Sequence, residues 1–232
     1  GISGTPSSAL PIALGDCQWE PLSEGRFFRT LTGPKFIKTS KPLESSWSVE
    51  SLLIRVAKMS NIAALIDAGA LVTGMSNQKV AEFLLSVPNG LEGKDGVVFI
   101  DEDDQQMIMV RSNKAVIPVQ DCTVSMSRRF TFYDQVHTTG MDIAQTPNAI
   151  AVLTIGKDMM YRDYAQAAYR MRRLGAGQQL RIIFPESILA LIKEYFPNAD
   201  VDSSQIEKIV KFLIINSVND LKAQESQLQV NQ

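Results

Sequence analysis

The stretch that decides the fold is AIAVLTIGKDMMYRDYAQAAYRMRRLGAGQQLRIIFP, which spans residues 149–185. Residues 149–155 are almost continuously apolar, which is typical of a strand covered on both faces. Residues 160–174 predict a helix, and Gly175 is a good helix stop signal. Residues 180–184 predict a second strand that ends at a proline. The stretch therefore predicts a strand–helix–strand unit, from which parallel sheets are built.

The same alternation extends on both sides of this stretch. Apolar spacing and turn residues predict a helix at 47–59, a strand at 63–69, a helix capped by Ser76, a β-hairpin at 97–110, a strand at 130–133, and helices at 187–196 and 204–224. Residues 1–45 are rich in Gly, Pro and Ser and predict a connector with little regular structure. The predicted class is α/β: a mostly parallel sheet with helices on both faces, an inserted β-hairpin and a C-terminal helix.

Composition excludes several classes of function. Two cysteines, Cys17 and Cys122, and one histidine, His137, give neither a disulfide framework nor a multi-histidine metal centre. No apolar run approaches the roughly 20 residues that span a bilayer, and the first residues do not resemble a secretion signal. We therefore expect no metal site, no membrane partner and a cytoplasmic location. A net charge of −2 argues against a basic footprint over the whole surface, although five arginines lie between residues 162 and 181.

Three segments, in this order, resemble the motifs of superfamily-two helicases. Ile2-Ser3-Gly4-Thr5-Pro6 is similar to motif III, and Thr138-Thr139-Gly140-Met141-Asp142-Ile143 is similar to motif V. The third segment, Gln166-Ala-Ala-Tyr-Arg170-Met-Arg172-Arg173, resembles motif VI. The resemblance implies the second RecA-like lobe of such a protein. Residues 1–45 would then be a linker after motif III, 46–200 the lobe, and 201–232 a helical extension.

The runs at 132–142, 153–158 and 169–178 also resemble a family of very large proteins, some of which are named ubiquitin thioesterase. That name implies a ubiquitin-pathway protein as a partner. It describes no mechanism that these residues display.

The helicase resemblance implies roles for five residues. Arg173 would be an arginine finger with Arg170 as its partner, because a guanidinium stays charged and matches phosphate oxygens in a fork. Gly140, Asp142 and Gln166 would contribute to binding ATP, with magnesium held by a preceding RecA-like lobe. The simpler interpretation of the arginines is a solvated basic helix end. For Gly140 and Asp142 it is a glycine turn with a carboxylate that caps a helix. The family pattern is broken at Asp134, where threonine is usual, and at Tyr169, where glycine is usual.

The chain does not provide its own phosphate-binding machinery. The carboxylates at residues 101–104 imitate a magnesium-binding strand end, but they lie well after the motif III segment and between two strands, so we predict a hairpin turn. A Gly-x-x-x-x-Gly-Lys-Ser/Thr sequence does not occur. ATP hydrolysis is therefore expected only together with the preceding lobe.

Two alternatives to an ATP-dependent helicase or translocase, acting on nucleic acid or protein, stay open at this point. One is a catalytically silent RecA-like interaction module of a large ubiquitin-related protein. The other is a cysteine hydrolase that uses His137 with Cys122 or Cys17, although neither cysteine has a local signature. The simpler interpretation makes Cys122 a small buried hydrophobic residue and His137 a loop residue bonded to a backbone carbonyl.

Overall fold

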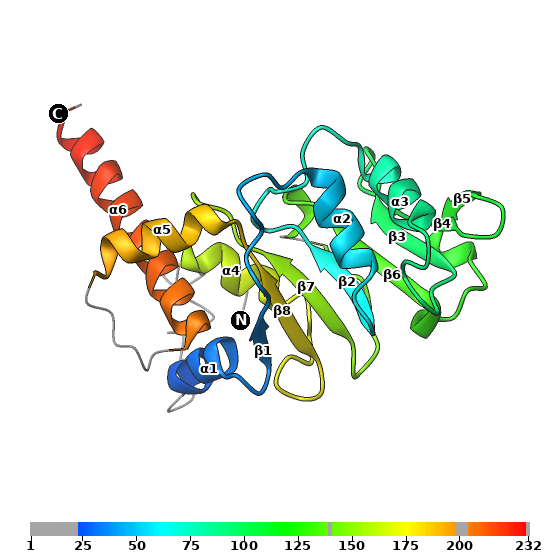
Figure 1. The fold of residues 1–232 in the computed structure, drawn as a ribbon, viewed down its shortest axis with the longest axis horizontal. Coiled ribbons are helices and arrows are strands. Elements are labelled where there is room, and N and C mark those ends of the chain that lie inside the picture. The colour runs from blue at the N-terminus through cyan, green and yellow to red at the C-terminus, as the bar shows by residue number, and fades with distance from the viewer. Residues whose placement is uncertain (1–22, 139–140, 198–203, 231–232) are drawn as a thin grey trace, which may run out of the picture.

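The computed structural model describes residues 23–138, 141–197 and 204–230. One eight-stranded sheet has the order β1-β8-β7-β2-β6-β3-β4-β5 (Figure 1). Its strands are β1 (Ile37–Thr39), β2 (Ile62–Ile66), β3 (Gly96–Ile100), β4 (Gln106–Val110), β5 (Val116–Pro118), β6 (Arg129–Tyr133), β7 (Ile150–Thr154) and β8 (Gln179–Ile183). The strands from β1 to β3 in the sheet order pair in parallel, whereas β4 and β5 are antiparallel.

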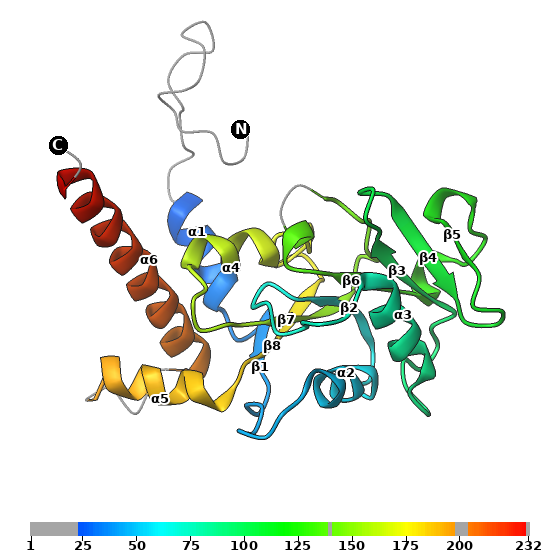
Figure 2. The same cartoon turned by 90° about the horizontal axis from the view of Figure 1, so that it is seen from above.

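Helices cover both faces of the sheet, as Figure 2 shows. They are α1 (Ser23–Thr32), α2 (Val49–Ala57), α3 (Asn77–Ser86), α4 (Tyr161–Ala168), α5 (Glu186–Tyr195) and α6 (Gln205–Val230). The predicted α/β class and the inserted hairpin are confirmed, and the arrangement is consistent with a RecA-like fold. None of the described helices has both the length and the apolar character needed to cross a membrane.

The sheet divides the interior into two cores because side chains alternate along each strand. Ala151 and Leu153 of β7 pack with α4 and α6, whereas Ile150 and Val152 face the core beneath α2 and α3. All five residues of β2 are buried. The prediction of strands covered on both faces is therefore confirmed at the centre of the sheet.

Local capping positions the two helices on the α2–α3 face. Ser48 caps α2 and forms a reciprocal capping box with Ser51. Ser76 caps α3 by accepting a hydrogen bond of 3.3 Å from the backbone N–H of Lys79, as its sequence position predicts.

The expectation of little regular structure before residue 45 is wrong for residues 23–39. Helix α1 buries Leu31 completely, and β1 forms the sheet edge beside β8, where Ile37 pairs with Leu180. A three-residue strand is too short to show a periodicity, and its partner lies far along the chain. This segment is therefore part of the folded body.

Helix α6 is longer than the predicted 204–224. Its first half belongs to the core through Ile206, Ile209, Val210, Phe212 and Leu213. Its second half extends beyond the sheet and the other helices (Figures 1 and 2). The first half of α6 therefore completes the core, and its second half projects from the folded body.

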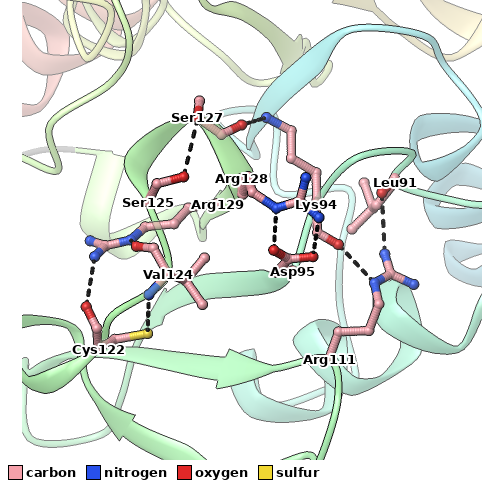
Figure 3. A network of polar contacts seen from close by, with 10 residues as sticks. All are labelled: Leu91, Lys94, Asp95, Arg111, Cys122, Val124, Ser125, Ser127, Arg128 and Arg129. Atoms are coloured by element: carbon pink, nitrogen blue, oxygen red, sulfur yellow. Dashed lines mark hydrogen bonds and ion pairs between the residues drawn. The ribbon is translucent and has the colours of Figure 1, made fainter.

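Three arginines fasten the amino ends of β3 and β6 (Figure 3). Arg111 donates to four carbonyl oxygens in the segment that precedes β3. Arg128 pairs with Asp95, and Arg129 donates to two carbonyls in the segment that precedes β6. Arg111 and Arg129 are half-buried and bound to backbone carbonyls, whereas Arg128 is exposed in its pair with Asp95.

Candidate functional site

The motif V-like and motif VI-like segments meet in the structure. Nη1 of Arg170 donates to the carbonyl oxygen of Met141, and Nε of Arg172 lies 3.2 Å from Oδ2 of Asp142. The first segment follows β6, and the second spans the last residues of α4 and the turns after it. Two segments that the sequence analysis singled out separately thus form one polar cluster on the surface. Gly140, and the motif III-like segment at residues 2–6, lie outside the described residues.

Tyr133, the last residue of β6, anchors the loop that carries Asp142. Its hydroxyl donates to the carbonyl of Ile143 at 3.1 Å and accepts from the backbone N–H of Ile143 at 3.2 Å. Burial raises the pKa of Tyr133 to about 12, so the phenol stays protonated and keeps its donor. The loop is therefore held to the end of the strand by a buried side chain.

The helix predicted at 160–174, which would have carried both Arg170 and Arg173, is shorter in the structure. Helix α4 ends at Ala168, and both arginines lie in the turns that follow. The buried side chain of Gln178 accepts from the backbone N–H of Arg173 at 2.7 Å and donates to the carbonyl of Thr146 at 2.9 Å. Gln178 thereby fixes this turn, a role that sequence spacing did not reveal.

The three arginines of the cluster differ in their freedom to bind a ligand. Arg170 is half-buried, burial lowers its pKa, and its Nε has no hydrogen-bond partner among the described residues. Arg172 is exposed but paired with Asp142. The side chain of Arg173 is exposed and makes no hydrogen bond or ion pair within the described part of the chain. Arg173 is thus the side chain most available to an anion.

Gln166 and Tyr169 lie at the border of this cluster. Gln166 is half-buried on α4, and its side chain forms no hydrogen bond to any described residue. Tyr169 stacks on Phe27 of α1, with ring centroids 4.9 Å apart and an interplanar angle of 14°. The tyrosine that departs from the family pattern therefore docks α1 against the turn that carries the arginines.

His137 bridges two carboxylates, so the expected bond to a backbone carbonyl is wrong. Its Nδ1 lies 2.5 Å from Oδ1 of Asp134, and its Nε2 lies 2.8 Å from Oδ1 of Asp104 in the β3–β4 turn. Partial burial works to lower the pKa of His137, but the two aspartates outweigh it, and the pKa is raised. The acidic turn, confirmed as a hairpin connection, is tied to the loop after β6 in this way.

We expect this bridge to make stability depend on pH. Because the folded-state pKa of His137 is raised, its contribution is complete below the unfolded pKa near 6.5 and is lost as the pH rises through the folded pKa. The free energy of unfolding, measured by urea denaturation between pH 5 and pH 8, should fall more steeply in this chain than in a His137→Asn variant. Equal slopes in the two proteins would contradict the bridge.

The cysteine–histidine arrangement needed for a hydrolase is not formed by the described residues. Both ring nitrogens of His137 contact carboxylates, and Cys122 accepts a hydrogen bond from the backbone N–H of Val124 at 3.4 Å. Cys122 is half-buried against the core, close to the expected small hydrophobic role. Cys17 lies outside the described residues.

Asp67 is a buried carboxylate at the carboxyl end of β2 that was not predicted from the sequence. Asp67 is 1 % exposed and accepts from the hydroxyl of Thr154 at 2.6 Å and from the backbone N–H groups of Leu71 and Val72 at 3.0 and 2.8 Å. Burial raises the pKa of Asp67, and these hydrogen bonds partly oppose that rise. A signal was present, since an aspartate directly follows a fully apolar strand.

Asp67 organises a close crossing of the loops after β2 and β7. The hydroxyl of Thr154 accepts from the backbone N–H of Gly69 at 3.0 Å. A Cβ atom on Gly69 would lie 2.5 Å from the backbone nitrogen of Gly156, so neither position has room for a side chain.

Comparison of the chain with protein-family models, with curated proteins and with solved structures finds no match.

Proposed function

We propose that this chain is the second lobe of a two-lobed, helicase-type ATPase. In this proposal Arg173 extends into a nucleotide cleft that a preceding RecA-like lobe completes, and Arg170 supports it from the same turn. The observation that carries the proposal is the meeting of the two helicase-like segments through the Arg170–Met141 and Arg172–Asp142 contacts. Nucleic acid or a ubiquitin-pathway protein would be the partner on which such a lobe acts.

The geometry supports a division of labour between the arginines. Arg173 is exposed, so its guanidinium can reach phosphate oxygens and neutralise charge that develops there. Arg170 is engaged with the loop after β6, which suits a residue that positions the turn. ATP would supply the phosphoryl group, and the magnesium-binding carboxylates would come from the other lobe.

The decisive experiment measures ATP hydrolysis by the longer protein that includes the preceding lobe, with and without RNA or DNA. Replacing Arg173 with alanine should lower kcat by about 1,000-fold, because one charge-stabilising donor is lost from the transition state. Arg162→Ala is the matched control, since Arg162 is an exposed arginine of α4 outside the cluster. Turnover that is indifferent to Arg173 in a folded protein would contradict the proposal.

A catalytically silent interaction module is the second candidate, and one feature favours it. Arg170 is committed to a backbone carbonyl, and Tyr169 is committed to Phe27, so much of the turn is occupied by internal packing. A parent protein without a phosphate loop before residue 1 would favour this candidate. The cysteine hydrolase is the weakest alternative, and it would require loss of peptidase activity in Cys122→Ala.

A further inference from the structure

A cavity of about 540 Å³ opens at the carboxyl edge of the sheet, and neither Arg170 nor Arg173 lines it. Its walls come from the loops that follow β2, β6, β7 and β8, together with Trp47 and Asp163 of α4. Chain connections diverge here, because β2 leads through α3 to β3 on one side, whereas β7 leads through α4 to β8 on the other. Parallel sheets bind ligands at such a switch point.

Contacts within the chain hold the inner wall of this cavity in place. Gly69 and Gly156 both line it, and their backbones approach so closely that neither position has room for a side chain. The buried carboxylate of Asp67 holds the loop from Gly69 to Val72 through its bonds to backbone N–H groups and to Thr154. A cavity with a fixed wall costs little to organise when a ligand binds.

The lining residues favour a flat ligand with polar edges. Trp47 is half-buried and is the only aromatic side chain among the described residues of the lining. Neutral hydrogen-bonding side chains come from Gln135 and Ser187, and the hydroxyl of Thr138, which donates to the carbonyl of Gln135, can still accept. A planar ring could stack on the indole while its polar edge meets these groups.

The charges of the lining limit the charge of the ligand. The charged side chains of the lining are one lysine, Lys157, and two aspartates, Asp158 and Asp163, and Asp163 also lies 3.5 Å from the guanidinium of Arg162. A diphosphate or triphosphate would bring several negative charges near the two carboxylates, and the single positive charge of Lys157 would not offset that repulsion. One phosphate could pair with Lys157. The carboxylates can accept hydrogen bonds from amino or hydroxyl groups.

We propose that this cavity binds one nucleoside unit that carries at most one phosphate, with Trp47 as the stacking partner of the base. The unit could be a free nucleoside or nucleoside monophosphate, or one unpaired nucleotide of a strand. The proposal is independent of the ATPase hypothesis, because neither Arg170 nor Arg173 lines the cavity.

Isothermal titration calorimetry of the full chain tests the proposal with adenosine, AMP, ATP and tetra-adenylate as probes. We expect adenosine and AMP to bind and ATP to bind more weakly than AMP. Trp47→Ala should weaken adenosine binding about 10-fold, the usual effect of losing one base-stacking aromatic, and Trp47→Phe should retain most of it. Lys157→Ala should weaken AMP but not adenosine. Tetra-adenylate that binds at least 10-fold tighter than AMP would identify a strand as the source of the unit.

Several outcomes would overturn this proposal. One is the absence of heat with adenosine and AMP at millimolar concentration. Others are binding that is unchanged in Trp47→Ala, or ATP that binds more tightly than AMP. Arg173→Ala should leave adenosine binding unchanged, so failure of the ATPase test and failure of this test are separate results. Because Trp47→Ala removes a half-buried side chain, its folding is checked by circular dichroism, and the Trp47→Phe and Lys157→Ala results stand without it.

Discussion

Replacing Asp67 with alanine should lower the free energy of unfolding by about 3 kcal/mol, the cost of leaving its buried donors without an acceptor. The side chain is 1 % exposed and satisfies three donors, which alanine would leave buried and unpaired. Urea denaturation monitored by circular dichroism measures the change. The loop that Asp67 organises should also become susceptible to proteolysis at residues 68–72.

Two further variants control for this effect. Thr154→Val removes one of the three donors to Asp67 and the acceptor of the Gly69 N–H but keeps the shape of the side chain, so it should cost about 1–2 kcal/mol. Asp67→Asn keeps an acceptor and should fall between the two. If Asp67→Ala costs no more than Thr154→Val, the carboxylate does not organise the loop, and its burial needs another account.

Replacing Gly156 with alanine should cost about 3 kcal/mol, near the upper end for overpacking, because the new methyl group meets backbone. Its nearest atoms are the carbonyl oxygen, carbonyl carbon and Cα of Gly69, none of which can swing aside like a side chain. Two strand ends would have to separate to admit it. Thermal unfolding of the variant should show a lower midpoint than that of the unaltered chain.

Gly25→Ala is the matched control for this substitution. Gly25 lies in α1, and a Cβ atom there would meet nothing within 4 Å. The same chemical change should therefore stabilise the chain by up to about 1 kcal/mol, because alanine is the better helix former. A Gly156→Ala variant as stable as Gly25→Ala would show that the crossing of the two loops is loose.

The regular part of the fold was predictable from local patterns. The apolar run that became β7, the cap at Ser76 and the acidic hairpin turn each carry their signal within a few residues. Contacts between residues far apart in the sequence carried no such signal. Strand β1 is defined by its pairing with β8, and α4 ends well before Gly175. Gln178, from beyond that glycine, holds the turn that follows the helix.

The candidate site was predictable only in part. The two helicase-like segments were found by their residue types, and the structure brings Asp142 and Arg170 into one cluster. Asp67 and Thr154 are far apart in sequence, and no spacing rule connects them. Burial is what makes that pair important, and burial at a strand end depends on the whole sheet. A carboxylate directly after an apolar strand, with a glycine two residues later, was the available hint.

The strand order has a consequence for how this chain acquires its structure during synthesis. Strands β3, β4 and β5 pair with their neighbours along the chain, so they can form as soon as residue 118 has emerged. Strand β2 must wait for β6 and β7, and β1 must wait for β8, which ends at Ile183. Loops of this length make pairing slow and leave strand edges temporarily open to other chains. Strand β1, the earliest of the described strands in the chain, is thus among the last to find its place in the sheet.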